Sequence, residues 1–315
     1  MKDIFNKIVA AVKGDPTEKL LRSYGCAFER RADGTLFVPG SLDLSHGRMT
    51  QLPDLSSVHI GGNFTCQYNE LTSLAGAPAS VGGNFVCSDN QLTTLEGGPA
   101  HVGGSYICSD NQLTTLQGAP NHPINGKFIC TDNQLISLAG APPVILSNFE
   151  CHHNALTSLV GGPARVDGNY NCTYNKLTTL EGAPPTVGGG FYCSHNQLTS
   201  FAGAPATCGG SLYCHDNQLT TLIGVPQIPG SDYAFYCTKN KLKTLEGAPK
   251  KFMTLDSDFG TFYSWDKVPD NIKICEESKA RQKLQKVFEA TVLQNDTPVL
   301  QPVRIKSRVK LPRAA

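Results

Sequence analysis

Hydrophobic residues recur along this chain at an almost constant interval of 21 positions. One unit, residues 85–95, has the pattern apolar-x-Cys-x-x-Asn-x-Leu-x-x-Leu. Successive cysteines of the pattern are separated by 21, 21, 22, 21, 21, 21, 21 and 23 residues, at Cys66, Cys87, Cys108, Cys130, Cys151, Cys172, Cys193, Cys214 and Cys237. A short fixed period is typical of a solenoid, in which each repeat forms one rung and stacks on its neighbours.

Inside each unit the apolar positions predict a short strand with one face toward a core. Side chains alternate between the two faces of a strand, so Cys87 and Phe85, two positions earlier, point the same way. Leu92, Leu95 and Val102 add further apolar positions. One unit cannot bury this set alone, whereas stacked units form a continuous core. We therefore predict a β-rich solenoid with a parallel sheet on its concave side, and extended or 3₁₀ segments elsewhere in each rung.

Two polar features of the unit predict how its bends are stabilised. An asparagine lies three residues after each cysteine, as Asn90 does, where the strand ends. A side-chain amide at that point can bond the backbone of adjacent rungs. A Gly-Gly pair such as Gly82-Gly83 precedes the strand in several units and supplies either a positive φ or a close approach between backbones.

Both ends of the chain depart from the repeat. Residues 1–13 place apolar side chains at helical spacing, and residues 26–38 indicate a hairpin with its turn at Asp33-Gly34. An atypical first rung begins at Leu42, residues 252–265 form a closing rung, and a helix follows over about 271–294. We predict an N-terminal helix and hairpin cap over 1–40, the solenoid over 41–265, and a C-terminal helix and basic tail over 266–315. The terminal helices either cap the solenoid or dock a partner.

Charge and cysteine content bear on the partner and the compartment. The net charge of +1 argues against binding nucleic acid or an acidic membrane with the whole surface. The sequence has no recognisable secretory leader and no apolar run long enough to span a membrane. Nine of the 12 cysteines share one repeated slot, which favours buried free thiols over disulfides. We expect a soluble protein of a reducing compartment.

The strand positions that alternate with the core set predict the binding surface. These slots lie one before, one after and two after each cysteine. Asp89, Asp110 and Asp132 occupy the last of them in consecutive units and form an acidic column. The following units carry histidines and tyrosines instead. We predict that a partner binds there, at Glu150, His152, His153, Tyr174, Tyr192, His195, Tyr213, His215, Asp216, Tyr236 and Lys239.

These side chains have alternative roles that depend on their type. Tyr192, Tyr213 and Tyr236 occupy one slot, where tyrosine either anchors a protein interface or stabilises neighbouring strands by stacking. His153 and His195 stand two rungs apart, about 10 Å, and the spacing indicates no cysteine or carboxylate that converges with them. A single line of carboxylates coordinates calcium poorly. The sequence therefore predicts no catalytic residue, no metal and no cofactor.

A basic segment lies near the end of the chain. Arg304, Lys306, Arg308 and Lys310 alternate with apolar residues, and no acidic residue follows Asp296. The pattern suits either an edge strand protected by charge or a segment that contacts nucleic acid or an acidic partner. Apart from this tail, we expect no binding to nucleic acid.

The repeat Gly-x-Phe-x-Cys-x-x-Asn-x-Leu-Thr-x-Leu-x-Gly-Ala-Pro resembles the leucine-rich repeats of many bacteriophage and prophage proteins. Residues 33–45, DGTLFVPGSLDLS, resemble the opening segment of that family, and the resemblance covers about residues 20–265. Ile136 and Phe201 depart from the usual Thr and Leu. The resemblance implies a leucine-rich-repeat solenoid of phage or prophage origin, in the bacterial host cytoplasm or a virion. Members of that family largely lack an assigned function, so it implies no catalytic residue.

A second resemblance is to secreted bacterial effectors with repeats of similar length. Their repeats read Leu-Pro-x-Leu-Pro where this chain has Gly-Ala-Pro, and the roughly 50 residues after the array are too few for the ubiquitin-ligase domain that some carry. The sequence thus favours a non-enzymatic scaffold that binds a host or viral protein through its concave face. The alternatives are a structural virion component (tail, baseplate or capsid-associated) that docks through its termini and, more remotely, a secreted effector or an enzyme.

Overall fold

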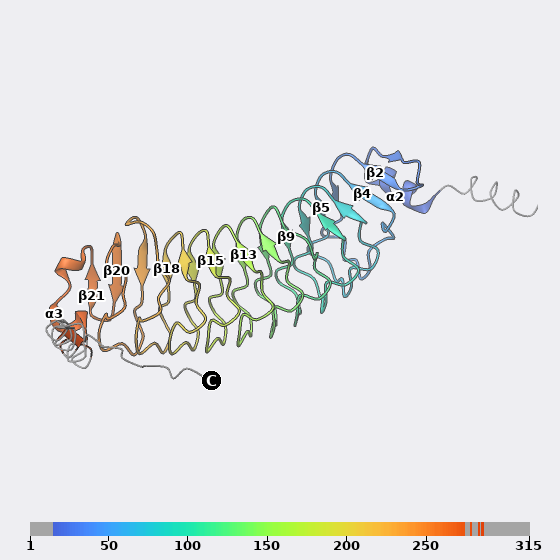
Figure 1. The fold of residues 1–315 in the computed structure, drawn as a ribbon. Helices are drawn as coiled ribbons and strands as arrows, with labels where there is room; N and C mark the ends of the chain where they lie inside the picture. Colours follow the sequence, from blue (N-terminus) through green and yellow to red (C-terminus); the bar gives the residue numbers. More distant parts are fainter. Residues whose placement is uncertain (1–14, 275–277, 279–282, 284, 287–315) are drawn as a thin grey trace, which may run out of the picture. The chain divides into compact units, whose positions relative to one another are not determined.

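A computed structural model describes residues 15–274, 278, 283 and 285–286 of the 315-residue chain. Residues 1–273 form one compact unit and residues 274–315 a second. Within the first unit the described residues form a parallel β-solenoid of about 11 turns, which confirms the predicted fold class (Figure 1). The predicted helix over 1–13, the basic tail and most of the C-terminal helix lie outside the described residues.

The elements of the solenoid are short, and most strands have two residues. In chain order they are α2 (Pro16–Ser23), β1 (Glu29–Arg30), β2 (Leu36–Val38), β3 (Leu42–Asp43), β4 (Val58–Ile60), β5 (Phe64–Thr65), β6 (Ser80–Val81), β7 (Phe85–Val86), β8 (His101–Val102), β9 (Tyr106–Ile107), β10 (Phe128–Ile129), β11 (Val144–Ile145), β12 (Phe149–Glu150), β13 (Arg165–Val166), β14 (Tyr170–Asn171), β15 (Thr186–Val187), β16 (Phe191–Tyr192), β17 (Thr207–Cys208), β18 (Leu212–Tyr213), β19 (Ala234–Tyr236), β20 (Thr254–Ser257), β21 (Gly260–Phe262), the 3₁₀ turn η1 (Trp265–Lys267) and α3 (Asp270–Lys273).

Two strands of each typical rung join different sheets. The second strand joins a 12-stranded sheet, the long sheet, in the order β21-β20-β19-β18-β16-β14-β12-β10-β9-β7-β5-β3. Its strands from β3 to β20 are parallel, and β21 pairs with β20 in the antiparallel direction. The first strand joins either β1-β2-β4-β6-β8 or β11-β13-β15-β17. These two short sheets are separated at residues 121–125, in the repeat between Cys108 and Cys130 that is 22 residues long. An isolated bridge between Ile124 and Ile145 remains there.

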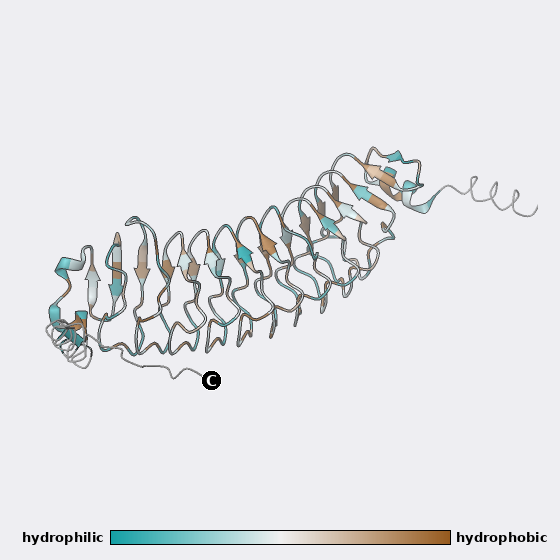
Figure 2. Ribbon diagram, in the orientation of Figure 1, coloured by the Kyte–Doolittle hydropathy of each residue, from teal (hydrophilic) through white to brown (hydrophobic). Residues whose placement is uncertain are grey.

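The core is a column of stacked side chains that passes through every regular rung. Aromatic rings from Phe64 to Phe191 lie one above another with centroids 4.9–5.9 Å apart. In Figure 2 the strands range from brown to teal along the row, because the outward residue changes while the inward one stays apolar. The repeat therefore fixes the buried half of each strand and leaves the outward half free to vary.

The cysteine column is buried beside the aromatic rings, as the sequence predicts. Each cysteine of the repeat is 0 % exposed, and the described cysteines are free thiols. The thiol of Cys130 donates to the Glu150 carbonyl of the next rung at 3.4 Å, and most other rungs repeat this contact. Burial raises the pKa of Cys66 to about 12, so its thiol stays protonated at neutral pH and is a poor nucleophile.

The two glycine features have different physical causes. A Cβ on Gly82 would lie 2.5 Å from the Gly61 carbonyl oxygen, and one on Gly103 would lie 2.3 Å from that of Gly82. Neither glycine has a positive φ, so the Gly-Gly pairs serve close approach between rungs. Gly182, which begins a Gly-Ala-Pro turn, does adopt a positive φ of +92° that other residues rarely adopt.

The asparagines form a buried ladder along the ends of the long sheet. Nδ2 of Asn90 donates to the carbonyls of Cys87 and Ser88 in its own rung and of Cys66 in the preceding one, at 3.0–3.2 Å. Its Oδ1 accepts from the Leu71 N–H of that preceding rung at 3.0 Å. Each amide therefore ties two rungs together, which confirms its predicted role.

A second ladder, which the sequence analysis missed, follows the Gly-Gly corner. Oδ1 of Asn63 accepts from the Asn84 N–H at 2.8 Å, and Oδ1 of Asn84 accepts from the Ser105 N–H at 2.7 Å. Oγ of Ser105 then accepts from the Lys127 N–H at 3.0 Å. In the sequence this ladder is indicated by an asparagine or a serine directly before the core aromatic residue.

Local hydrogen bonds and packing stabilise both described ends of the solenoid. The helix α2, also missed, begins after Asp15, whose side chain accepts from the Thr17 N–H, and it buries Leu21 completely. Strands β1 and β2 form the hairpin predicted around Asp33-Gly34. At the other end the Asp258 carboxylate accepts from the backbone N–H groups of Lys239 and Asn240, at 2.6 and 3.0 Å. It replaces the carbonyl that another rung would supply.

Two rungs carry a buried tyrosine where the others have phenylalanine or leucine, and both make room for the additional hydroxyl group. The hydroxyls of Tyr106 and Tyr170 have no hydrogen-bond partner among the described residues. A Cβ on Gly98 would lie 3.3 Å from Tyr106 Oη, and one on Gly162 would lie 3.4 Å from Tyr170 Oη. These rungs read Gly-Gly-Pro, where most others read Gly-Ala-Pro. The missing methyl group makes room for the hydroxyl.

Replacing Asn111 by Ala should destabilise the solenoid strongly. The change removes four hydrogen bonds, three from Nδ2 and one to Oδ1, at a site that is 8 % exposed. We expect a loss of about 3 kcal/mol in the free energy of unfolding. The exposed neighbour Gln112→Ala should change it by less than about 0.5 kcal/mol. Urea unfolding of both variants tests this, and equal effects would contradict the ladder's role.

A double-mutant cycle on Gly98 and Tyr106 should show coupling. Gly98→Ala alone should destabilise, because the new methyl group crowds the hydroxyl. In a Tyr106→Phe background the same change should cost less, since the contact with the hydroxyl is gone and only those with the Leu95 carbonyl oxygen and the Leu74 side chain remain. We expect a coupling free energy of about 1–2 kcal/mol, measured from urea unfolding midpoints of the four proteins. Additive effects would show that the two positions are independent.

Candidate functional site

Every regular rung projects its outward residues in the same geometry. The residue two after each cysteine adopts a left-handed backbone with φ between 52° and 55°, at Tyr68, Asp89, Asp110, Asp132, His153, Tyr174, His195, Asp216 and Lys239. Aspartate tolerates this conformation better than most residues. The left-handed backbone therefore explains in part why aspartate occupies this slot in the acidic column. Because the kink repeats, these side chains stand in one line along the outer face of the long sheet.

The predicted site residues divide among the three outward slots. The slot before the cysteine contains Glu150, Tyr192, Tyr213 and Tyr236, which are half-buried. The slot after the cysteine contains His152 and His215, also half-buried. The left-handed slot contains His153, Tyr174, His195, Asp216 and Lys239. The structure therefore places the tyrosine column in the floor of the surface and the left-handed column beside it.

The rings of each column contact their neighbours in adjacent rungs. The ring of Tyr174 lies between those of His153 and His195, with centroids 4.4 and 4.1 Å away and planes tilted by 12° and 9°. Tyr213 lies 4.8 Å from Tyr192 and from Tyr236, with tilted rings. The tyrosine rings therefore contact one another along the column, with planes tilted by 34° and 59°, and these contacts restrict the orientation of each ring.

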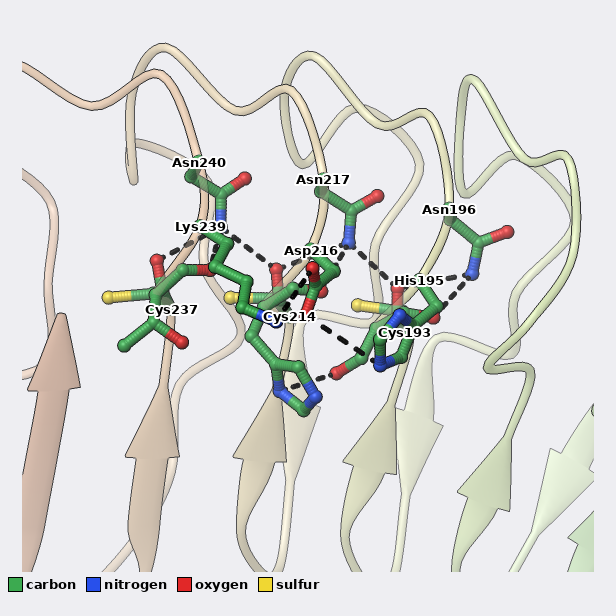
Figure 3. A network of polar contacts seen from close by, with 12 residues as sticks. Cys193, His195, Asn196, Cys214, Asp216, Asn217, Cys237, Lys239 and Asn240 are labelled. Atoms are coloured by element: carbon green, nitrogen blue, oxygen red, sulfur yellow. Dashed lines mark hydrogen bonds and ion pairs between the residues drawn. The ribbon is translucent and has the colours of Figure 1, made fainter. Parts of the chain in front are cut away.

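Polar contacts join neighbouring rungs along the outward slots at the last three of these rungs (Figure 3). His195 Nε2 lies 3.7 Å from Asp216 Oδ2, and Lys239 Nζ lies 3.3 Å from Asp216 Oδ1. His215 Nδ1 lies 2.9 Å from the hydroxyl of Ser194. Burial lowers the pKa of His215 and the facing His195 lowers it further, so this imidazole is neutral at pH 7.

A related cluster lies three rungs earlier. The Nδ1 atoms of His152 and His153 are 2.8 Å apart, and Asp132 has an oxygen within 4.8 Å of the histidine ligand atoms. Burial, and then the charge of His153, lower the pKa of His152. Asp132, one rung before these histidines, therefore lies beside both, and the expectation that no carboxylate converges with them is wrong.

Between the two columns lies an open hollow of about 300 Å³. Five predicted residues line it together with three small polar ones, in full Asn171, Thr173, Tyr174, Tyr192, Ser194, His195, Tyr213 and His215. The small residues were absent from the predicted set. Their signal was available, since they occupy the same outward slots in the rungs of Tyr174 and His195.

One carboxylate stands apart from the histidines. Burial raises the pKa of Glu150, and hydrogen bonds from Asn171 and Asn148 together with the charge of Lys127 partly offset this. Burial also raises the pKa of Tyr192, with smaller contributions from Tyr213 and Glu150. Glu150 is therefore held by amides of its own rung, from Asn148, and of the neighbouring strand, from Asn171.

The arrangement contains one pair of side chains with the composition of a nucleophile and base. Ser194 faces His215, but its residue is 1 % exposed. Nδ1 of the imidazole faces the serine, and Asp216 contacts His195 and Lys239. A hydroxyl this deeply buried offers a substrate little access.

Comparison with known proteins does not place the chain in a group: no family model matches it, and a search of curated proteins returned no significant match. None of the helices in the described part of the chain combines the length and the apolar character that crossing a membrane requires.

Replacing Asp110 by Asn should stabilise the protein at neutral pH. Burial, followed by the charges of Asp89 and Asp132, raises the pKa of Asp110. A raised folded-state pKa lowers stability as pH rises through it, and asparagine removes that loss while tolerating the left-handed backbone. The melting temperature should rise at pH 7, and the gain should vanish below about pH 4. The exposed Glu96→Gln provides the control; a gain independent of pH would contradict the electrostatic cause.

Proposed function

We propose that this protein is a non-enzymatic scaffold of phage or prophage origin that binds a host or viral protein through the outer face of its long sheet. The contact region is the surface that extends from Glu150 to Lys239. The observation that carries the proposal is the pair of stacked columns around the hollow. Tyrosine and histidine are held there at fixed steps of one rung, with Tyr174 46 % exposed.

Rigidity and composition support this role. Tyrosine gives a protein interface large apolar area and a hydroxyl at little cost in conformational entropy. Stacking has already ordered Tyr192, Tyr213 and Tyr236, so binding need not freeze them again. Hydrogen-bonding groups at the hollow's rim, including Thr173 and His215, can select a partner's orientation.

A binding role is preferred to an enzymatic one. The titratable groups of the surface contact one another, as His152 does His153, and the serine beside His215 is buried. The phage origin rests on the repeat Gly-x-Phe-x-Cys-x-x-Asn-x-Leu-Thr-x-Leu-x-Gly-Ala-Pro and the segment at residues 33–45. The cytoplasm of an infected bacterium, or the virion, is the compartment that this origin implies.

A structural virion component remains the second candidate. In that case the contacts would come from the terminal segments, residues 1–14 and 287–315, which lie outside the described residues. The tagged protein, expressed during infection, would then be recovered with capsid or tail proteins irrespective of changes on the long sheet.

The experiment that tests the proposal is affinity capture during infection with a triple variant, Tyr192, Tyr213 and Tyr236 all changed to Ala. A specific host or viral protein should be captured by the unchanged chain and lost from the variant by at least about tenfold. The matched control changes Val86, Ile107 and Ile129 to Thr. These residues occupy the same half-buried slot in earlier rungs.

Both variants must first show unfolding midpoints close to that of the unchanged chain. Loss of the partner from the tyrosine variant alone supports binding through this surface. Equal retention by both variants, with recovery of virion proteins, would overturn it in favour of the terminal segments.

A further inference from the structure

We propose that His195, His215 and Asp216 form a binding site for one divalent transition-metal ion of the zinc class, at the edge of the hollow on the long sheet. One ligand atom from each residue lies within 4.8 Å of those of the other two. This site goes beyond the proposed scaffold role, and its test needs no protein partner.

The solenoid geometry brings these three side chains together. His195 occupies the left-handed slot of one rung, and His215 and Asp216 occupy two outward slots of the next. The left-handed turn at Asp216 places the consecutive residues His215 and Asp216 on the outer face together. Two adjacent rungs thus supply three ligands to one point, although 21 residues separate His195 from Asp216.

The distances are close to those of a coordinated ion. Ligand atoms bound about 2.0–2.1 Å from a tetrahedral zinc ion are roughly 3.3 Å apart. His195 Nε2 and Asp216 Oδ2 are 3.7 Å apart (Figure 3). Small side-chain rotations would close the remaining gap, and the hollow leaves room for water at an open coordination position.

Contacts outside the three ligands orient both imidazoles. The hydroxyl of Ser194, which is 1 % exposed, lies 2.9 Å from His215 Nδ1, so Nε2 remains available as the ligand atom. The ring of His195 stacks on Tyr174 at 4.1 Å. Such outer contacts are typical of histidine ligands, whose second nitrogen or ring face is held by the protein.

The donor set indicates the class of ion. Two imidazoles and one carboxylate suit zinc, cobalt or nickel, whereas magnesium and calcium prefer sites made of oxygen. Lys239 opposes the ion, because its Nζ lies 3.3 Å from the other carboxylate oxygen.

The earlier cluster offers an internal comparison. Asp132, His152 and His153 occupy the same three slots with aspartate and histidine exchanged. There Asp132 and His153 are exposed, and the two Nδ1 atoms already bond each other. In the proposed site all three residues are half-buried, and the two rings again meet edge to face at 5.1 Å. Their nitrogens do not bond each other there, since His215 Nδ1 lies beside Ser194 and His195 Nε2 lies beside Asp216. The proposed site is therefore better organised for an ion.

The test uses the full chain with Cys26 and Cys275 changed to Ser, so that the ten buried cysteines are the only thiols left. Cobalt(II) titration followed by visible absorption, and zinc competition against it, measure the affinity. We expect d–d bands without a thiolate charge-transfer band. His195→Asn or Asp216→Asn should weaken binding at least about 100-fold, and asparagine suits the left-handed backbone at both positions.

Two further variants separate a lost ligand from a misfolded protein. Lys239→Met should tighten binding roughly tenfold, since it removes a positive charge near the ion. His152→Ala, in the same slot as His215 but three rungs away, should retain the ion that His215→Ala loses. No cobalt or zinc binding, a thiolate band, or equal affinity in His195→Asn, Asp216→Asn and the unchanged chain would overturn the proposal.

Discussion

The buried asparagine amide is the interaction on which this solenoid depends. Each rung turns sharply after a strand of two residues. The carbonyl of the residue after the cysteine still accepts from the backbone of the preceding rung, as that of Ser88 does from the Tyr68 N–H, whereas the carbonyl of the cysteine lies at the bend itself. Asn90 Nδ2 donates to both, and to a carbonyl of the rung below, while its Oδ1 accepts from that rung's backbone. Leaving such groups unpaired inside the protein costs about 1–3 kcal/mol each. The amide therefore pairs the backbone groups at the bend and also joins neighbouring rungs.

The same turn creates the outer surface. The residue before each asparagine must adopt a left-handed backbone, and its side chain then projects beside the strand's outward residue. Repetition places these side chains in one line, where rings such as Tyr174 can stack. A structural solution to a backbone problem thus supplies a rigid row of variable positions, which is the arrangement that a binding scaffold requires.

Strict packing inside and freedom outside explain the variation along the chain. Inward positions tolerate little change, as the pairing of Tyr106 with Gly98 indicates, because an extra atom must be matched by the loss of another. Outward positions change from aspartate to histidine to tyrosine without altering the rung. The polar clusters around His152 and His215 lie at these variable outward positions. We propose that the cluster around His215 holds a cation.

The sequence by itself determined the period, the inward cysteines and aromatics, the asparagine ladder and the outward slots. All of these follow from local alternation and a repeat that must stack. It could not determine which side chains from different rungs meet, because that depends on the stacking distance and on the left-handed turn. The tertiary structure brought Asp132 to His152 and Asp216 to His195 and formed the hollow beside Tyr174. It also decided that Gly82 serves close approach, since only the neighbouring rung shows what a Cβ would meet there.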